Sequence, residues 1–336
     1  MRAVILASGR GERLAPLTDR QPKPLLPAAN QPLLSYLLHA LSAAGFTEVL
    51  VTLGYLGDQV KAFLATVAVD LSIETVAAPD WPRGPLGSLQ AVVPLLKDES
   101  AFALLPADLY IDAENLHRLG SAKADDWALL YDPNQRRLGP GLELDANHRA
   151  TRLLLSTAGG PARLPIVPVL RATPRLFEMK QHARAQQAST VFELLQLWVS
   201  LGHPLQGLPI ARTFWIDIDS PGDLMHLNDH LLTTGWPPTP LPPGTYLPPG
   251  ATLDGPQRNA QLNLGVGSHV LGPALLGPGV HVGKRCRITG GTSLGADTAL
   301  RDTVVLDHSI TLPHTQVPAN AEVHDAILDA YGNAVR

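Results

Sequence analysis

A glycine-rich segment that carries several cations follows the first apolar run of the chain. It reads ASGRGERLAPLTDRQPKPLLP, residues 7–27, and comes directly after the run AVIL. Gly9 and Gly11 let the backbone approach a bulky anion closely, while Arg13 and Lys23 supply positive charge. These residue types at this spacing predict a site for phosphate groups.

Two familiar phosphate-binding loops do not fit this segment. A P-loop needs lysine and then serine or threonine after its second glycine, whereas Glu12 and Arg13 follow Gly11. The dinucleotide fingerprint needs a third glycine at the position that Leu14 occupies. The segment is therefore expected to bind phosphate in another way.

Composition narrows the choice of partners and compartment. The 336 residues predict about two domains, and the net charge of -4, with 26 basic against 30 acidic residues, gives no basic surface for nucleic acid. The single cysteine, Cys286, excludes an internal disulfide framework and suits a reducing compartment. Because no apolar stretch reaches the roughly 18 residues needed to span a bilayer, we expect a cytoplasmic protein without a membrane partner.

Strand-like and helix-like patterns alternate up to about residue 235. This alternation predicts an α/β fold in which a mostly parallel sheet carries helices on both faces. Ligands of such sheets bind beyond the carboxyl ends of the strands, where residues 7–27 and Asp108 both lie. The strand-like runs are 2–7, 48–53, 72–77, 102–110 and 126–132, and the helix-like runs are 31–46, 57–67, 87–96 and 112–122.

A period of six residues follows a proline-rich stretch. Large aliphatic residues recur at every sixth position, which is the hexapeptide pattern of a parallel β-helix whose inward residues stack from coil to coil. We expect an α/β domain over 1–235, a proline-rich linker over 236–250, a β-helix over 251–320 and a C-terminal cap over 321–336, with a short helix at 321–332. The recurring residues are Leu264, Val270, Leu276, Val282, Ile288, Leu294, Leu300, Leu306 and Leu312.

These features together resemble the nucleoside-diphosphate-sugar pyrophosphorylases, also called sugar-1-phosphate nucleotidyltransferases. The resemblance rests on the glycine-rich loop, on Arg13, on PLT at 16–18 and PKPLLP at 22–27, and on the hexapeptide repeat. Among members of that family, the chain resembles mannose-1-phosphate guanylyltransferases and glucose-1-phosphate thymidylyl- or uridylyltransferases. The resemblance implies a Rossmann-like nucleotidyltransferase domain followed by a left-handed parallel β-helix. It also implies a nucleoside triphosphate and a sugar-1-phosphate as substrates, Mg²⁺ as cofactor, and a homo-oligomer formed through the β-helix.

The resemblance also implies roles for individual residues. Arg13 would hold the leaving pyrophosphate, Lys23 would reach the reacting phosphates, and Asp108 and Asp217 would hold Mg²⁺. Asp219 stands where the family usually has glycine. The nucleotide would be bound by Ala7, Ser8, Gly9 and Gly11 and, in the loop 82–92, by Gly84 and Gly87.

The sugar side departs from the family pattern. Leu155, Ser156 and Thr157 occupy the positions of the usual glutamate, lysine and proline, and Leu164 that of the sugar-binding asparagine. Candidate cations for the sugar phosphate are Arg152, Arg163 and Arg171.

Two other functions remain open at this point. One is a weakly active or inactive relative that binds nucleotide or nucleotide sugar as a regulatory or assembly subunit. The other is acyl transfer on the β-helix, for which the candidate histidines are His269, His281, His308 and His314.

Overall fold

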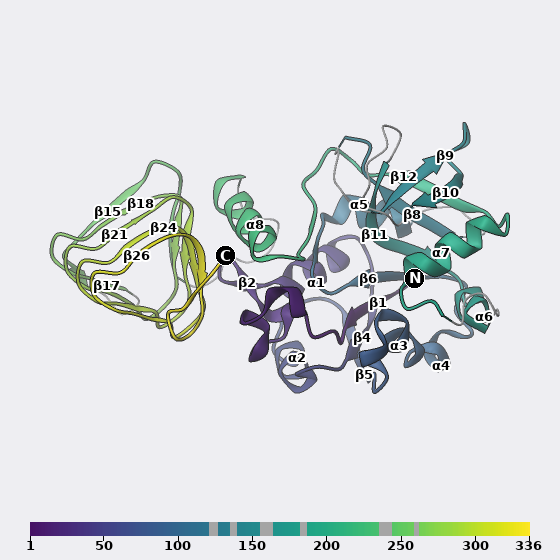
Figure 1. Ribbon diagram of the computed structural model, residues 1–336, viewed down its shortest axis with the longest axis horizontal. Helices are drawn as coiled ribbons and strands as arrows, with labels where there is room; N and C mark the ends of the chain where they lie inside the picture. Colours follow the sequence, from purple (N-terminus) through teal and green to yellow (C-terminus); the bar gives the residue numbers. More distant parts are fainter. Residues whose placement is uncertain (121–126, 135–139, 155–163, 182–186, 235–243, 259–261) are drawn as a thin grey trace. The chain divides into compact units, whose positions relative to one another are not determined.

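The chain folds into two compact units. The computed structural model describes residues 1–120, 127–134, 140–154, 164–181, 187–234, 244–258 and 262–336 (Figure 1). The first unit comprises residues 1–10 and 37–215, and the second comprises residues 11–36 and 216–336. Most of the expected linker, residues 236–250, lies outside the described residues.

The first unit is built on a mixed sheet whose central strands are parallel. Its strand order is β10-β9-β11-β6-β1-β4-β5, and β8 joins β12 to β11. The sheet is parallel from β6 to β5, whereas β11 runs antiparallel to β6 and β8. The strands are β1 (Arg2–Ala7), β4 (Glu48–Leu53), β5 (Ser72–Ala77), β6 (Phe102–Pro106), β8 (Trp127–Tyr131), β9 (Gly141–Leu144), β10 (Ala150–Leu154), β11 (Leu164–Ala172) and β12 (Leu205–Pro209).

Helices connect these strands and reverse the direction of the chain across the sheet. From β1 the chain moves outward through β4 to β5, and then returns past β1 to β6. Since parallel crossovers are right-handed, the outward and returning helices lie on opposite faces of the sheet. The helices are α1 (Leu33–Ala43), α2 (Gly57–Leu64), α3 (Pro85–Gln90), α4 (Val93–Leu96), α5 (Ala113–Gly120), α6 (Arg175–Gln181) and α7 (Val191–Ser200).

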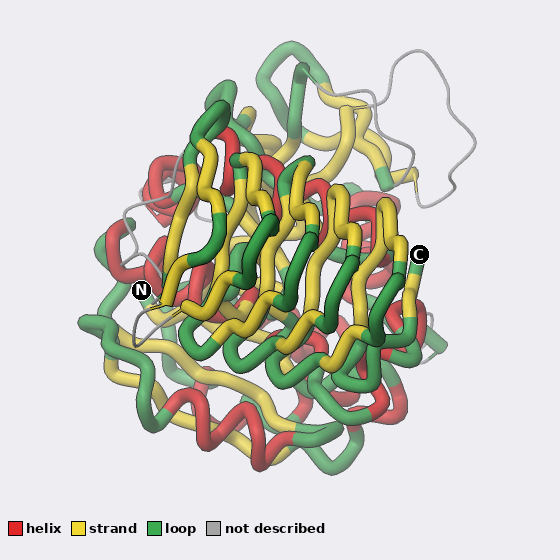
Figure 2. Tube along the Cα trace, turned by 90° about the vertical axis from the view of Figure 1, so that its left-hand side faces the viewer, coloured by secondary structure: helices red, strands yellow, loops and turns green. Residues whose placement is uncertain are grey.

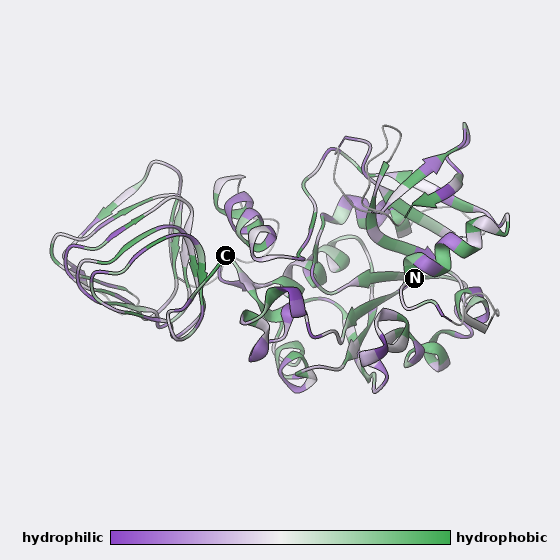
Figure 3. Cartoon of the chain, viewed as in Figure 1, coloured by the Kyte–Doolittle hydropathy of each residue, from purple (hydrophilic) through white to green (hydrophobic). Residues whose placement is uncertain are grey.

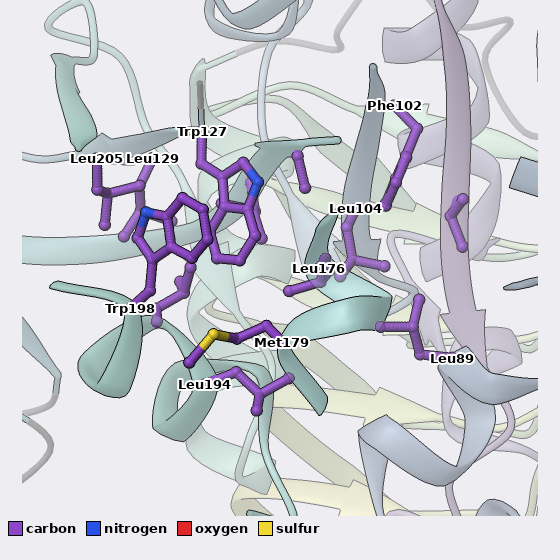
Figure 4. Packing of buried hydrophobic residues seen from close by; sticks show 14 of the residues in the cluster. Leu89, Phe102, Leu104, Trp127, Leu129, Leu176, Met179, Leu194, Trp198 and Leu205 are labelled. Atoms are coloured by element: carbon purple, nitrogen blue, oxygen red, sulfur yellow. The ribbon is translucent and has the colours of Figure 1, made fainter. Parts of the chain in front are cut away.

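The central strands are apolar along most of their length because both faces of the sheet are covered (Figure 3). On one face, Leu89 of α3 and Leu194 of α7 belong to a single buried cluster with residues of the strands (Figure 4). Trp127 of β8 stacks on Trp198 of α7 in this cluster, with ring centroids 3.9 Å apart. The predicted α/β sheet is thus confirmed.

In its described residues, the second unit combines the segment 11–36, the helix α8 and a stack of coils. The segment contains single-turn 3-10 helices at Glu12–Leu14, Leu17–Asp19 and Lys23–Leu25, and then the short strands β2 (Pro27–Ala28) and β3 (Gln31–Pro32). The helix is α8 (Pro221–Thr234). Strands of the stack are β14 (Thr245–Leu247), β15 (Thr252–Asp254), β16 (Gln257–Arg258), β17 (Leu262–Leu264), β18 (His269–Leu271), β19 (Ala274–Leu276), β20 (Val280–Val282), β21 (Arg287–Thr289), β22 (Thr292–Leu294), β23 (Ala299–Leu300), β24 (Val305–Thr311), β25 (Gln316–Val317), β26 (Glu322–Leu328) and β27 (Ala334–Val335).

The coils stack as a parallel β-helix (Figure 2). Leu262 pairs with Val280, and Ala274 with Thr292, so successive coils are 18 residues apart. A coil of this length equals three periods of six residues, and all nine of the recurring aliphatic residues are buried. The core of the β-helix is therefore the one that the repeat predicts.

The two ends of the stack are closed by antiparallel strands. At the start, β14, β15 and β16 run antiparallel to β19, β18 and β17. At the end, β27 runs antiparallel to β26. The helix expected at 321–332 is wrong, because β26 pairs in parallel with β24 and buries Ile327 and Leu328 in the stack. The hydrogen bonds that the preceding coil offers outweigh the helical preference of this stretch.

Candidate active site

The carboxyl ends of β1 and β6 form the switch point of the first unit's sheet. These neighbouring strands pair with Leu6 opposite Pro106, and the chain leaves them in opposite directions across the sheet. Ser8 and the half-buried Asp108 each follow two residues later, at the same edge. Ligands of open α/β sheets bind at such an edge. The fold thus brings together the start of the glycine-rich segment and one of the two predicted metal-binding aspartates.

Ser8 ties the glycine-rich segment to the loop that contains Gly84 and Gly87. Its buried hydroxyl donates to Ser88 Oγ at 2.5 Å, and its carbonyl oxygen accepts from the amide of Tyr55 at 3.0 Å. Sequence reasoning missed the role of Ser88, because only the folded chain brings residues 8 and 88 together. The connection fixes the backbone from which the segment begins.

The loop before α3 depends on one glycine for close packing. A Cβ atom at Gly87 would lie 2.1 Å from the carbonyl oxygen of Asp80, which no side chain tolerates. The carbonyl oxygen of Gly84 accepts from the amides of Gly87 and Ser88 at 3.0 and 3.2 Å. Any larger residue at position 87 would therefore displace the loop.

Gly9 has different surroundings from Gly87. Apart from its two chain neighbours, no described residue has an atom within 4 Å of a Cβ placed at Gly9. The packing of the described residues therefore does not require glycine here, and the space beside this backbone is open.

The second unit holds the two predicted cations in one segment. Gly11 has a φ of 70°, and a Cβ there would lie 3.0 Å from Cβ of Lys23, so glycine lets the lysine side chain pack against the turn. The carbonyl oxygen of Gly11 accepts from Thr18 Oγ1 at 3.0 Å. The Lys23 side chain is only 13% exposed, whereas that of Arg13 is 72% exposed.

Both cations meet at one carboxylate oxygen. Arg13 Nη2 lies 2.5 Å and Lys23 Nζ 3.4 Å from Oδ1 of Asp219. Asp217, at the end of β13 (Ile216–Asp217), is half-buried and has a carboxylate oxygen within 4.8 Å of one of Asp219. Arg13, Lys23 and Asp217 are thus gathered in the second unit.

The start of α8 holds the backbone that follows Asp217. Asp223 Oδ2 accepts from the amide of Asp219 at 3.1 Å and from Ser220 Oγ at 2.7 Å, and the amide of Asp223 donates back to Ser220 Oγ. These bonds form a helix N-cap, which satisfies amide groups that would otherwise lack partners. Asp219 is therefore fixed just before the helix.

The chain leading to this region is held inside the first unit by two buried polar residues that sequence reasoning missed. Asn115 of α5 accepts from the amide of Ala211 and donates to Thr213 Oγ1, both at 2.8 Å. Asp132 accepts from the indole N–H of Trp215 at 2.8 Å. Only the interruption of the apolar stripe of α5 by Asn115 could have pointed to this role.

The candidate cations for the sugar phosphate lie away from the switch point or outside the described residues. Arg171 of β11 pairs with Ala103, five residues before Asp108, which at about 3.3 Å per residue is about 16 Å along the strand. Arg152 of β10 is exposed and lies 4.0 Å from Glu143 Oε1. Arg163 lies outside the described residues, as do Leu155, Ser156 and Thr157.

One cavity of the first unit lies away from the switch point. It is open to solvent and has a volume of about 640 Å³ between β10 and α7, where Arg152, Glu193 and Gln196 contribute to its lining. β10 is three strands away from β6 in the sheet, or about 14 Å. We therefore assign the site by strand ends and charged groups rather than by cavity size.

The histidines of the β-helix interact with carboxylates. His308 contacts Asp229 and Asp325, His269 contacts Asp254, and His314 lies 3.6 Å from Asp297. His281 is exposed. A catalytic role in acyl transfer gains no support from these contacts.

One phenol beside the switch point stays neutral at physiological pH. Burial raises the pKa of Tyr110 to about 12, and the negative charge of Asp112 adds to the shift. Tyr110 can therefore donate a hydrogen bond but cannot act as an anionic base at neutral pH.

Among the described helices, none has the length and apolar character needed to cross a bilayer.

Comparison with known proteins gives a consistent assignment. The MobA-like NTP transferase domain family matches residues 3–205, more than half of the chain. N-acetylmuramate alpha-1-phosphate uridylyltransferase of Neisseria meningitidis is 38% identical over 117 residues, 34% of this chain and 49% of that protein. A mannose-1-phosphate guanyltransferase of Gibberella zeae is 36% identical over 118 residues, 33% of this chain and 31% of that protein.

A longer match covers about two thirds of the chain. The low-salt glycan biosynthesis nucleotidyltransferase Agl11 of Haloferax volcanii is 24% identical over 239 residues, 69% of this chain and 66% of that protein. The two shorter matches span half or less of the relatives' own length. The chain belongs to the MobA-like NTP transferase family, as its resemblance to the sugar-1-phosphate nucleotidyltransferases predicts.

Proposed function

We propose that the chain transfers a nucleotidyl group from a nucleoside triphosphate to a hexose-1-phosphate. The observation that carries this proposal is the meeting of Arg13 and Lys23 at one anionic oxygen. Two cations that converge on one oxygen are suited to a polyphosphate, which carries several negative charges close together. The chain's family membership and the names of its relatives support the same reaction.

The reaction requires positioning and charge neutralisation rather than a covalent nucleophile. An oxygen of the sugar phosphate attacks the α-phosphorus of the triphosphate, and the bond to the bridging oxygen breaks. The electron pair of that bond leaves with pyrophosphate. Arg13 and Lys23 stabilise the negative charge that develops on pyrophosphate, and Lys23 is the more firmly held of the two because it is nearly buried.

The nucleotide occupies the switch point in this proposal. Ala7, Ser8 and Gly9 line the approach of the triphosphate, Gly11 continues it, and the loop of Gly84 and Gly87 contacts the base. The Ser8–Ser88 hydrogen bond supports this arrangement because it holds the two loops of the first unit together.

Asp108 and Asp217 are the proposed ligands of Mg²⁺. The donor set fits this ion, since Mg²⁺ prefers carboxylate oxygens and takes only one or two from protein. Both side chains are half-buried, and Asp217 has a second carboxylate nearby in Asp219. When bound, Mg²⁺ neutralises part of the phosphate charge.

A thermal-shift panel with one variant tests the proposal. A nucleoside triphosphate at a hundred times its dissociation constant should stabilise the chain by about 2.7 kcal/mol. Arg13→Ala should remove most of this shift and leave the melting temperature of the unliganded chain nearly unchanged, because the side chain is exposed. Arg20→Ala, which changes an arginine of the same segment that stacks on Tyr331, is the matched control.

Pyrophosphate release in the presence of each triphosphate and sugar-1-phosphate completes the test. Equal nucleotide binding by wild type and Arg13→Ala would contradict the phosphate site. Binding without any turnover would instead favour a regulatory or assembly subunit.

We also propose that the β-helix assembles copies of the chain, which sedimentation of the full chain would check.

A further inference from the structure

Asp219 occupies the place between the two cations where a phosphate would bind. Its Oδ1 atom is the one that Arg13 and Lys23 both approach. The residue comes from residues 216–336 of the second unit, whereas both cations come from residues 11–36. The contact is thus formed by segments about 200 residues apart in sequence, and it offsets part of the positive charge of the two cations within the chain itself.

We propose that Asp219 is an internal competitor for the pyrophosphate site, which must leave the cations when pyrophosphate binds and returns to them when it departs. This inference rests on the proposed function of the same site. Its consequence is weaker binding and easier release of pyrophosphate.

The geometry favours exchange over permanent pairing. The amide of Asp219 is held by Asp223 at the start of α8, so the backbone stays in place while the short side chain can rotate. Lys23 is packed against the turn at Gly11 and stays in place as well. Arg13 is 72% exposed, so its guanidinium can follow either anion.

Charge decides the competition. A single carboxylate offers one negative charge to the two cations, whereas pyrophosphate offers several and can contact both cations with different oxygens. The pair with Arg13 is exposed and exposed ion pairs are weak, so the carboxylate can be displaced. Even so, each pair must be broken before pyrophosphate binds, and the measured affinity is lowered by that cost.

Titration of inorganic pyrophosphate by calorimetry, in the absence of divalent metal, tests the inference. Asp219→Asn keeps the shape of the side chain and removes its charge. We expect the dissociation constant to fall by about two- to tenfold, the effect of removing two partly exposed ion pairs. Asp219→Glu keeps the charge and should bind pyrophosphate within about twofold of wild type.

Glu12→Gln is the matched control, because it removes one negative charge from the exposed part of the same segment. An equal gain in Glu12→Gln and Asp219→Asn would overturn the inference in favour of a general charge effect. Unchanged or weaker binding by Asp219→Asn would also overturn it, while leaving the nucleotidyltransferase assignment intact. If wild type and all variants bind neither pyrophosphate nor any triphosphate, both the proposed function and this inference are wrong.

Discussion

His308 of the β-helix donates a hydrogen bond to Asp229 of α8 across 2.6 Å, and its other ring nitrogen lies 2.5 Å from Oδ1 of Asp325. Both nitrogens of one imidazole thus face carboxylates. Only the protonated ring carries an N–H on each nitrogen and can donate to both. Burial lowers the pKa of His308, but the bonds to Asp325 and Asp229 outweigh it, so the net pKa is raised. Burial in turn raises the pKa of Asp229. This cost of burying the carboxylate offsets part of the stability that its pair with His308 contributes.

The first prediction is a pH-dependent contact between α8 and the β-helix. Because folding raises the pKa of His308, its stabilisation is complete below the unfolded pKa of about 6.5 and is lost as the pH rises through the folded pKa. His308→Gln should therefore lower stability by about 1 kcal/mol at pH 6 and by less at pH 9. Thermal melts at both pH values would show this, with the exposed His281→Gln as control. An equal loss at both pH values would contradict the assignment.

The second prediction concerns Asn228, a fully buried residue of α8 that joins three segments of the second unit. Its Oδ1 accepts from the amide of Ala29 at 2.9 Å and from Ser293 Oγ at 2.7 Å, and its Nδ2 donates to the carbonyl oxygen of Gly291 at 2.9 Å. Asn228→Leu would leave these groups without partners, at about 1–3 kcal/mol each. We expect a loss of about 3 kcal/mol or more, seen as a lower urea midpoint.

Asp229→Asn is a useful comparison, because it changes the next residue of α8 and removes the negative charge that faces His308. If both variants unfold at the same urea concentration, Asn228 does not have the joining role that its hydrogen bonds indicate.

The third prediction separates a glycine that the ligand needs from one that the fold needs. Gly9→Ala meets open space, so stability should stay within about 0.5 kcal/mol while binding of nucleoside triphosphate weakens. Gly87→Ala places a Cβ against the carbonyl oxygen of Asp80, so both stability and binding should fall. Thermal melts with and without triphosphate distinguish the two outcomes. Normal nucleotide binding by Gly9→Ala would contradict the proposed approach of the triphosphate.

Much of the fold could be predicted because the signals are local. The period of six residues requires only that Val270, Ile288 and Leu306 point into one core, and they do. The stretch that contains Ile327 and Leu328 shows the limit of such reasoning. Its pattern suits a helix, but the exposed edge of the preceding coil pairs with it as strand β26.

The residues of the candidate site can be proposed from the sequence by their types, whereas the contacts between them cannot. Arg13 and Lys23 are recognisable beside their glycines, but nothing near them in the sequence points to Asp219, about 200 residues away. Likewise, Ser88 and Asn228 act through hydrogen bonds that only tertiary packing creates. Sequence patterns report which side of an element is buried, and they do not report which distant polar group it meets.

The fourth prediction concerns the two aspartates proposed to hold Mg²⁺. Asp108→Asn and Asp217→Asn should each reduce the extra stabilisation that Mg²⁺ gives in the presence of nucleoside triphosphate, since an amide lacks the negative charge that this ion prefers. Melts with triphosphate, with and without Mg²⁺, measure this difference. Asp58→Asn, near the start of α2, is a control for net charge. If both site variants behave as wild type, Asp108 and Asp217 are not the ligands of the metal ion.

The last prediction concerns the choice of sugar. Leu164, at the start of β11, is half-buried where the family has an asparagine, and an apolar side chain offers no hydrogen bond to a sugar hydroxyl. Strong discrimination between substrates comes from groups that pair with hydroxyls and that lose their partners when the wrong sugar binds. We therefore expect low turnover, with glucose-, mannose- and N-acetylhexosamine-1-phosphates used within about tenfold of one another. Leu164→Asn should increase the preference for one of them, which coupled pyrophosphate release would show.

Fast turnover of a single sugar phosphate by wild type would mean that other residues supply the missing contacts. Tight binding of a nucleotide sugar without turnover would favour the regulatory subunit.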